Sequence, residues 1–170
     1  MSIERARAWL TARGVAPARI LEFPVSSATV ELAAKALNCA PERIAKTLAL
    51  RLPGTAGDGA VLIVAAGDAR LDNAKYKARF GCKPKMLGRE EAADCVGHAA
   101  GGVCPFGVNP GVEVWLDESL RRFDTVFPAA GSANSAIELS LAELEELSCA
   151  GGWVDVCRLP EITLKEGKEK

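Results

Sequence analysis

One lysine of this 170-residue chain stands where a charged side chain is unusual. The segment KTLALRL, residues 46–52, alternates with a period of two, so Lys46 shares a face with three leucines. A lysine on such a face either extends its ammonium past the end of the strand or directs it into a partly enclosed site, where it can neutralise phosphate or developing negative charge. The pattern by itself favours the first interpretation; the second makes Lys46 a candidate catalytic residue.

A glycine-rich stretch forms the second chemical feature. GHAAGGVCPFGVNPG, residues 97–111, has five glycines and two prolines. A surface loop is the simplest interpretation, because glycine permits positive φ and proline fixes φ. The same composition suits a loop whose backbone N–H groups hold an anion or a carbonyl oxygen, since a ligand can approach glycine closely. On this second interpretation, the missing Cβ atoms of Gly101 and Gly102 leave room for a ligand.

The same loop carries His98, the single histidine of the chain, and Cys104. An imidazole beside a thiol can generate a nucleophilic thiolate, so the pair raises the alternative of a thiol enzyme. No third residue that would orient the imidazole is identifiable, and a cysteine is more often a small buried apolar residue. Asp68, Asp72 and Asp117 could pair as acid and base, but each stands where a turn or a helix start favours a carboxylate.

Several common site types lack their motifs. The chain has no GxxxxGK[ST], GxGxxG, HExxH or GxSxG pattern, which removes the usual support for nucleotide hydrolysis, Rossmann chemistry, zinc proteolysis and serine-hydrolase chemistry. Six cysteines show neither CxxC nor Cys/His ligand spacing: Cys39, Cys82, Cys95, Cys104, Cys149 and Cys157. We therefore expect reduced thiols, no metal site and no disulfide framework.

Net charge and hydropathy limit the kinds of partner that the sequence predicts. A formal net charge of −1 argues against binding along a nucleic-acid duplex through many phosphate contacts. A local contact to one end of an RNA is compatible with this charge. Basic residues gather between positions 75 and 85, where a solvated surface is the simplest interpretation: Lys75, Lys77, Arg79, Lys83 and Lys85. The N-terminal segment has no apolar core of a signal peptide, and no run of eighteen apolar residues occurs. We expect a soluble, cytoplasmic protein without a membrane partner.

Periodicity and capping signals predict the elements that position these residues. Helices are expected at 2–13, 29–38, 71–80, 89–96 and 141–148, the last with a capping box of Ser140 and Glu143. Strands are expected at 19–24, 46–52, 60–67, 83–87, 112–117, 125–131, 135–141 and 153–159. This irregular order favours a mixed α/β fold with one mixed, barrel-like sheet and helices outside it. We predict a single domain over residues 1–170, with its core at about 20–150 and a charged tail at about 160–170.

Four segments, taken in order, resemble the YbaK/EbsC family, which shares its domain with the editing insert of bacterial prolyl-tRNA synthetases. They are SSATVELAAKALNCAPERIAKTLAL, LIVAAGDARLD, GGVCPFG and VWLDESLRRFDTVFPAAGSANSAIELSLAELEEL, and the similarity runs from about residue 20 to residue 150. The resemblance implies a barrel-like fold and a metal-independent, cofactor-free deacylase. Such an enzyme hydrolyses the ester of a mischarged tRNA, typically tRNA for proline carrying alanine, serine, threonine or cysteine.

The resemblance also implies the site residues. The family's active-site lysine matches Lys46, and its GxxxP loop matches Gly101 to Pro105, with Gly102, Val103 and Cys104 between them. A looser match places Gly131, Ser132 and Asn134 along the pocket. The implied partner is the acceptor end of the tRNA, with prolyl-tRNA synthetase as a second candidate. A non-catalytic module that binds tRNA or a synthetase, and a thiol enzyme using Cys104 and His98, stay open as alternatives; the oligomeric state is not indicated.

Overall fold

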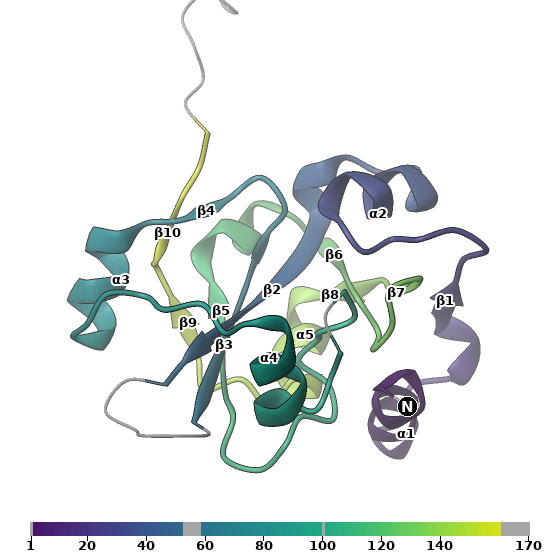
Figure 1. Cartoon of the computed structure of the whole chain (residues 1–170). Helices are drawn as coiled ribbons and strands as arrows, with labels where there is room; N and C mark the ends of the chain where they lie inside the picture. The colour runs from purple at the N-terminus through teal and green to yellow at the C-terminus, as the bar shows by residue number, and fades with distance from the viewer. Residues whose placement is uncertain (1, 53–58, 100, 161–170) are drawn as a thin grey trace, which may run out of the picture.

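The computed structural model describes residues 2–52, 59–99 and 101–160. The residues between the strands predicted at 46–52 and 60–67, and the predicted charged tail, lie almost entirely outside these ranges. Within them the chain folds as a mixed sheet that curls into a half-barrel, with helices around it, as the sequence predicts (Figure 1).

The central sheet has six strands in the order β8-β6-β2-β3-β5-β9. Its middle is the antiparallel pair of β2 and β3. Three of the four outer pairings are parallel, and the fourth, between β6 and β8, is antiparallel. The strands are β2 (Ile44–Arg51), β3 (Ala60–Ala66), β5 (Glu113–Asp117), β6 (Thr125–Pro128), β8 (Leu139–Ser140) and β9 (Trp153–Val154). Every residue of β3 is buried, which explains why its sequence is a continuous apolar run rather than an alternating one.

Two small antiparallel pairs complete the strands. β1 (Ile20–Glu22) pairs with β7 (Ser135–Ile137), and β4 (Arg70–Leu71) pairs with β10 (Cys157–Arg158). The strand predicted at 153–159 is therefore divided between two sheets, because the chain leaves the central sheet after β9 to reach β4. The prediction at 135–141 is likewise divided, between β7 and β8.

Five α-helices occur within the described residues, each at a predicted position: α1 (Ser2–Ala12), α2 (Val30–Leu37), α3 (Asn73–Phe80), α4 (Arg89–Val96) and α5 (Leu141–Leu147). Short 3-10 turns lie at Pro17–Arg19, Pro41–Arg43 and Glu118–Arg122. The predicted capping box is present, since the Ser140 hydroxyl accepts from the Glu143 N–H and the Glu143 carboxylate accepts from the Ser140 N–H. α1 lies next to the β1 segment (Figure 1), and its Trp9 indole donates to the carbonyl of Leu147 at 2.7 Å.

The predicted strand at 83–87 is wrong. Only one bridge forms there, between Leu50 and Met86, supported by hydrogen bonds from the Arg51 N–H to Lys85 and from the Leu87 N–H to Ala49. Pro84 has no N–H to continue the pairing, and the Met86 side chain is 54% exposed. The segment touches the end of β2 and then turns away.

This short contact leaves a gap along one side of β2. On the side away from β3, β6 pairs with β2 only at Ile44 and Ala45, and the 85–87 segment meets it only at Ala49–Arg51. In the described part of the chain no segment pairs with residues 46–48 on this side, and we call this stretch the open edge of β2. It lies where the candidate site is found.

Candidate functional site

A pocket of about 270 Å³ lies against the open edge of β2. Its walls come from the segment that leads into α2, from β2, from residues 86–92 and from the glycine loop, with β6 and β7 closing the remaining side. Small-molecule sites usually have volumes of roughly 300–1,000 Å³. The pocket therefore suits one end of a substrate, and its walls are mostly small or apolar side chains.

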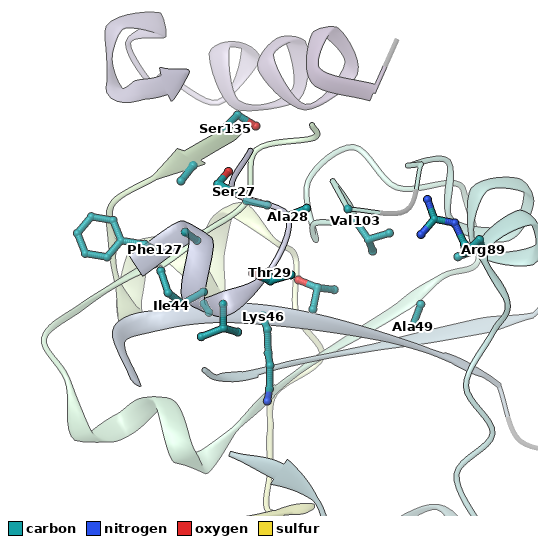
Figure 2. A pocket seen from close by; sticks show the side chains of 18 of the residues that line it. Ser27, Ala28, Thr29, Ile44, Lys46, Ala49, Arg89, Val103, Phe127 and Ser135 are labelled. Atoms are coloured by element: carbon teal, nitrogen blue, oxygen red, sulfur yellow. The ribbon is translucent and has the colours of Figure 1, made fainter. Parts of the chain in front are cut away.

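Lys46 belongs to the pocket wall, but its ammonium does not point into the pocket. The nitrogen Nζ donates to the carbonyl oxygens of Gly67, at 3.2 Å, and of Ala69. Figure 2 shows the side chain directed away from Thr29 and Phe127, the side chains on the other face of the strand. Burial lowers the pKa of this ammonium. Since β2 begins two residues before the predicted strand, Lys46 lies inside the strand and cannot simply extend past its end.

The turn held by Lys46 packs against the start of α2. A Cβ atom added at Gly67 would collide with the carbonyl oxygen of Pro41 and lie 2.8 Å from Val30 Cγ1. This close approach requires glycine, and Val30 is itself a pocket residue. The Lys46 ammonium therefore fixes a turn that supports one wall of the pocket.

The glycine loop contributes Gly101 and Val103 to the pocket. Gly101 has φ +90 and is exposed, and a Cβ there would lie 3.4 Å from Ala133 Cβ. Gly102 is buried, and a Cβ there would lie 2.6 Å from Ser132 Cα. The expectation of room for a ligand at Gly102 is thus wrong: the backbone of Gly131 and Ser132 occupies that space. The N–H of Gly102 is also engaged, donating to Ala99 at 3.0 Å.

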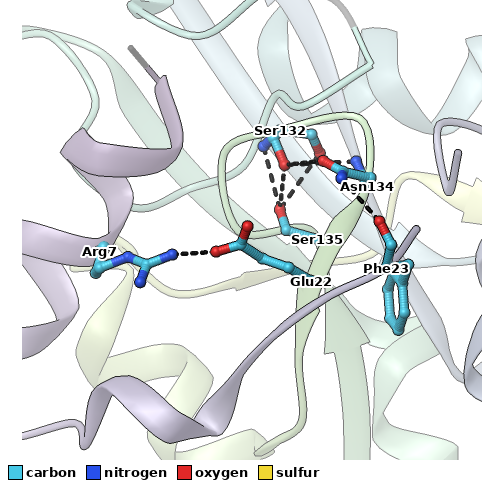
Figure 3. Close-up of polar contacts among 6 residues, drawn as sticks. All are labelled: Arg7, Glu22, Phe23, Ser132, Asn134 and Ser135. Atoms are coloured by element: carbon cyan, nitrogen blue, oxygen red, sulfur yellow. Dashed lines mark hydrogen bonds and ion pairs between the residues drawn. The ribbon is translucent and has the colours of Figure 1, made fainter. Parts of the chain in front are cut away.

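Among the described residues, the segment 131–134 does not line the pocket. It packs against the glycine loop at Gly102 instead. Ser132 Oγ donates to Asn134 Oδ1 at 2.9 Å and lies 2.8 Å from Ser135 Oγ, and Asn134 Nδ2 donates to the Phe23 carbonyl at 2.9 Å (Figure 3). Ser135 and Ala136, the next residues, are the ones that reach the pocket. An ion pair of Arg7 with Glu22 ties α1 to β1 beside this network.

Cys104 and His98 meet in the core instead of the pocket. Cys104 Sγ lies 3.6 Å from His98 Nε2, and both residues are 0% exposed. Nε2 also lies 2.7 Å from the Phe106 carbonyl oxygen, which can only accept, so Nε2 carries a proton and cannot take one from the thiol. Burial raises the pKa of the Cys104 thiol to about 12. The geometry therefore opposes a nucleophile–base pair. Pro105 is buried beside it.

The three aspartates considered as acid or base have structural partners. Asp117 accepts from the N–H groups of Ser119 and Val156, each at 2.9 Å, and Asp72 caps α3. Asp68 forms a two-bond ion pair with Arg122. Across residues 2–52, 59–99 and 101–160, no three His, Cys, Asp or Glu side chains gather as a metal site would require. The helices in the same ranges include none long and apolar enough to cross a membrane.

Two polar pocket residues were missed by the sequence patterns. Thr47 Oγ1 is buried without a hydrogen-bond partner in the described part of the chain, an arrangement that costs roughly 1–3 kcal/mol. Arg89, the first residue of α4, extends its guanidinium at the exposed rim (Figure 2). The period of β2 could have indicated Thr47, because it places residues 45, 47 and 49 on the face opposite Lys46.

The remaining polar side chains of the pocket bond within the fold. Thr29 Oγ1 caps α2 by accepting from the Leu32 N–H at 3.1 Å, and Ser27 Oγ donates to the Ala133 carbonyl at 3.4 Å. Ser135 Oγ accepts from the backbone N–H of Ser132 at 3.2 Å. Because the Lys46 ammonium bonds to the carbonyls of Gly67 and Ala69, Thr47 and Arg89 are, among the described residues, the pocket side chains with polar groups to offer a ligand.

Comparison with known proteins assigns the class. Residues 25–147 match the aminoacyl-tRNA editing domain, and the chain belongs to this family, also called the YbaK family. The match covers the pocket, Lys46 and the glycine loop, while α1 precedes it.

Three individual proteins are similar to the chain over most of its length. The chain is 52% identical over 139 residues to the uncharacterized protein YwhH of Bacillus subtilis (strain 168), a match that covers 82% of this chain and 87% of that protein. A crystal structure described as a candidate trans-editing enzyme for prolyl tRNA synthetase has a TM-score of 0.79 and 28% identity, covering 92% of this chain and 97% of the other. The hypothetical protein APE2540 has a TM-score of 0.78 at 28% identity, with 91% and 99% covered.

Proposed function

We propose that the protein is a deacylase that acts in trans on mischarged tRNA in the cytoplasm, hydrolysing the ester between a small wrong amino acid and the 3′ end. The observation that carries the proposal is the pocket itself: a small, mostly apolar recess between the exposed part of the glycine loop and the open edge of β2. The editing-domain family and the likeness to a trans-editing enzyme for prolyl tRNA synthetase support tRNA for proline as the substrate.

The reaction needs a held carbonyl and a positioned water. Water adds to the ester carbonyl carbon, the carbon–oxygen bond to the ribose breaks, and the ribose hydroxyl leaves with a proton beside the free amino acid. Negative charge develops on the carbonyl oxygen, and preorganised backbone donors stabilise it. We assign this role to the backbone around Gly101 and Val103, the loop residues that reach the pocket.

Lys46 and Gly102 act in this proposal by positioning. Lys46 fixes the turn at 67–69 and, through Val30, the wall formed by α2. Gly102 lets the loop lie directly on the backbone of Ser132. Arg89 at the rim supplies a cation for a phosphate of the acceptor end. In this proposal the amino acid removed is alanine, serine, threonine or cysteine.

A panel of tRNA(Pro) charged with alanine, serine, threonine, cysteine or proline tests the proposal. We expect metal-independent hydrolysis of at least one small wrong aminoacyl ester and little hydrolysis of the prolyl ester, measured by release of labelled amino acid with and without a chelator. Tight binding of every charged tRNA without hydrolysis would favour the alternative of a non-catalytic module. Loss of activity on chelation, restored by added metal, would contradict the metal-independent mechanism.

A further inference from the structure

Thr47 belongs to the pocket wall, has a polar side chain and lies at the open edge of β2. The hydroxyl Oγ1 is buried without a partner in the described part of the chain, whereas most buried hydroxyls have one. An unpaired buried polar group beside a cavity indicates a missing ligand or water. Thr47 belongs to the wall of the pocket, at the middle of the open edge of β2.

The direction of the Thr47 backbone groups follows from its neighbours in β2. The carbonyl of Ala49 and the N–H of Arg51 point to this side of the strand, because both bond to the 85–87 segment. Alternate residues of a strand present their backbone groups to the same side. The N–H and C=O of Thr47 therefore point toward the open edge, where no described segment pairs with them.

An aminoacyl ester carries the complementary groups. Its α-ammonium donates and its ester carbonyl accepts, with the spacing of a single residue of a β-strand. Residues that face one another in a hydrogen-bonded antiparallel pair exchange two such bonds, and extended ligands add to sheet edges in this way.

We propose that the open edge at Thr47 binds the aminoacyl group as a one-residue strand, and thereby selects esters of α-amino acids with a free amino group. The α-ammonium donates to the Thr47 carbonyl and Oγ1, and the ester carbonyl accepts from the Thr47 N–H. The glycine loop then provides the second donor to the same carbonyl oxygen. This inference rests on the proposed deacylase function. It adds that the enzyme recognises the free α-ammonium of its substrate.

The test compares two esters of one tRNA that differ only in the amine, alanyl-tRNA(Pro) and propionyl-tRNA(Pro). Each enzymatic kcat/KM is divided by the uncatalysed hydrolysis rate of the same ester, because the ammonium itself makes an ester more labile. We expect the wild type to favour the alanyl ester by about 100-fold after this correction, the scale of hydrogen bonds to a charged group.

Two variants separate Thr47 from a structural effect. Thr47→Val keeps the shape but removes Oγ1, and we expect it to reduce the preference about tenfold at an unchanged or higher melting temperature, whereas Thr47→Ser keeps the preference. Thr29→Val is the matched control: it removes the other threonine hydroxyl of the pocket, which caps α2, and lowers the melting temperature without changing the preference.

Each outcome is decisive. Equal corrected rates for the two esters in the wild type, an unchanged preference in Thr47→Val, or equal losses on both esters in a Thr47→Val protein with a lowered melting temperature would overturn the inference. A wild-type protein that hydrolyses neither this alanyl ester nor any of the other mischarged tRNAs would instead refute the proposed function, and the inference with it.

Discussion

The ammonium nitrogen of Lys46 lies 3.2 Å from the carbonyl oxygen of Gly67, on the side of β2 opposite the pocket face of Thr47. A residue expected to meet substrate directly is thus bonded to the protein's own backbone. Its influence on the pocket passes through a turn that leaves no space for a Cβ atom against Pro41 and Val30.

We expect Lys46→Ala to lower kcat/KM about 100-fold, because a displacement of about 1 Å in a site can cost that much. Two carbonyl oxygens lose their donor, so stability falls by about 1–2 kcal/mol as well. Deacylation and thermal unfolding measured on one preparation check both effects. Lys75→Ala is the control, since Lys75 also bonds two acceptors but lies outside the pocket. Lost activity at an unchanged melting temperature would assign Lys46 to direct charge compensation instead.

Gly101 and Gly102 are expected to respond differently to a methyl group. Gly102→Ala forces a Cβ against the Ser132 backbone and should destabilise the protein by about 1–3 kcal/mol while reducing activity. Gly101→Ala meets ordinary contacts and only the strain of its φ of +90, roughly 1 kcal/mol. Chemical denaturation of both variants measures the difference. Equal stability losses would show that the contact with Ser132 is not what requires glycine.

Arg89→Ala should weaken binding of tRNA and leave turnover of a small aminoacyl ester unchanged. A single contact to a single-stranded phosphate contributes a slope of about 0.7 in log affinity against log salt. We expect that much of the slope to disappear, with kcat kept. Lys77→Ala, which removes one charge from the exposed face of α3, is the matched control. An unchanged salt slope in Arg89→Ala would remove Arg89 from the contact.

His98 should make stability depend on pH. Burial is the main reason that the pKa of His98 is lowered from 6.5, and the nearby Arg5 acts in the same direction, while the bond to Phe106 opposes them. Below pH 6.5 and down to this lower pKa, the unfolded chain binds more protons, so stability falls as the pH decreases. Melting temperatures between about pH 7.5 and 5.5 should therefore drop in the wild type and less in His98→Gln. A parallel drop in both proteins would assign the effect elsewhere.

Thiol reagents should spare the activity. Cys104 is buried with a pKa of about 12, whereas Cys149 is exposed. Brief treatment with iodoacetamide is expected to modify Cys149, seen by mass spectrometry, and to leave deacylation within about threefold of the untreated rate, as should Cys104→Ala. Inactivation that follows modification of Cys104 would restore the thiol enzyme.

Local signals predicted the helices well. Thr29 and Ser140 are small polar residues at the starts of predicted helices, and both cap those helices, because a cap depends on three or four neighbouring residues. The strand predicted at 83–87 failed for the opposite reason. Whether that segment pairs depends on how far it follows β2, which its own residues do not encode.

The candidate site shows the same division. The glycine loop and Lys46 were found as unusual residues, but their directions were not. The sequence places Lys46 in phase with leucines without saying that the turn at 67–69 reaches it. Gly102 looks like room for a ligand until Ser132, thirty residues later, is brought onto it. Thr47 looks ordinary until both sides of β2 are known.

The contacts of α1 determine which residues a fragment must contain if it is to be fused to another protein. Arg5 donates to Asn109 at 2.7 Å, and a Cβ at Gly107 would lie 3.0 Å from the Arg5 carbonyl oxygen, so the helix rests directly on the far end of the glycine loop. Asn109 in turn donates to the carbonyls of Asp94 and Cys95 at the end of α4. A fragment trimmed to the family match, residues 25–147, would lack this helix. Fusions or grafts into a synthetase therefore need the preceding residues to keep the loop in place.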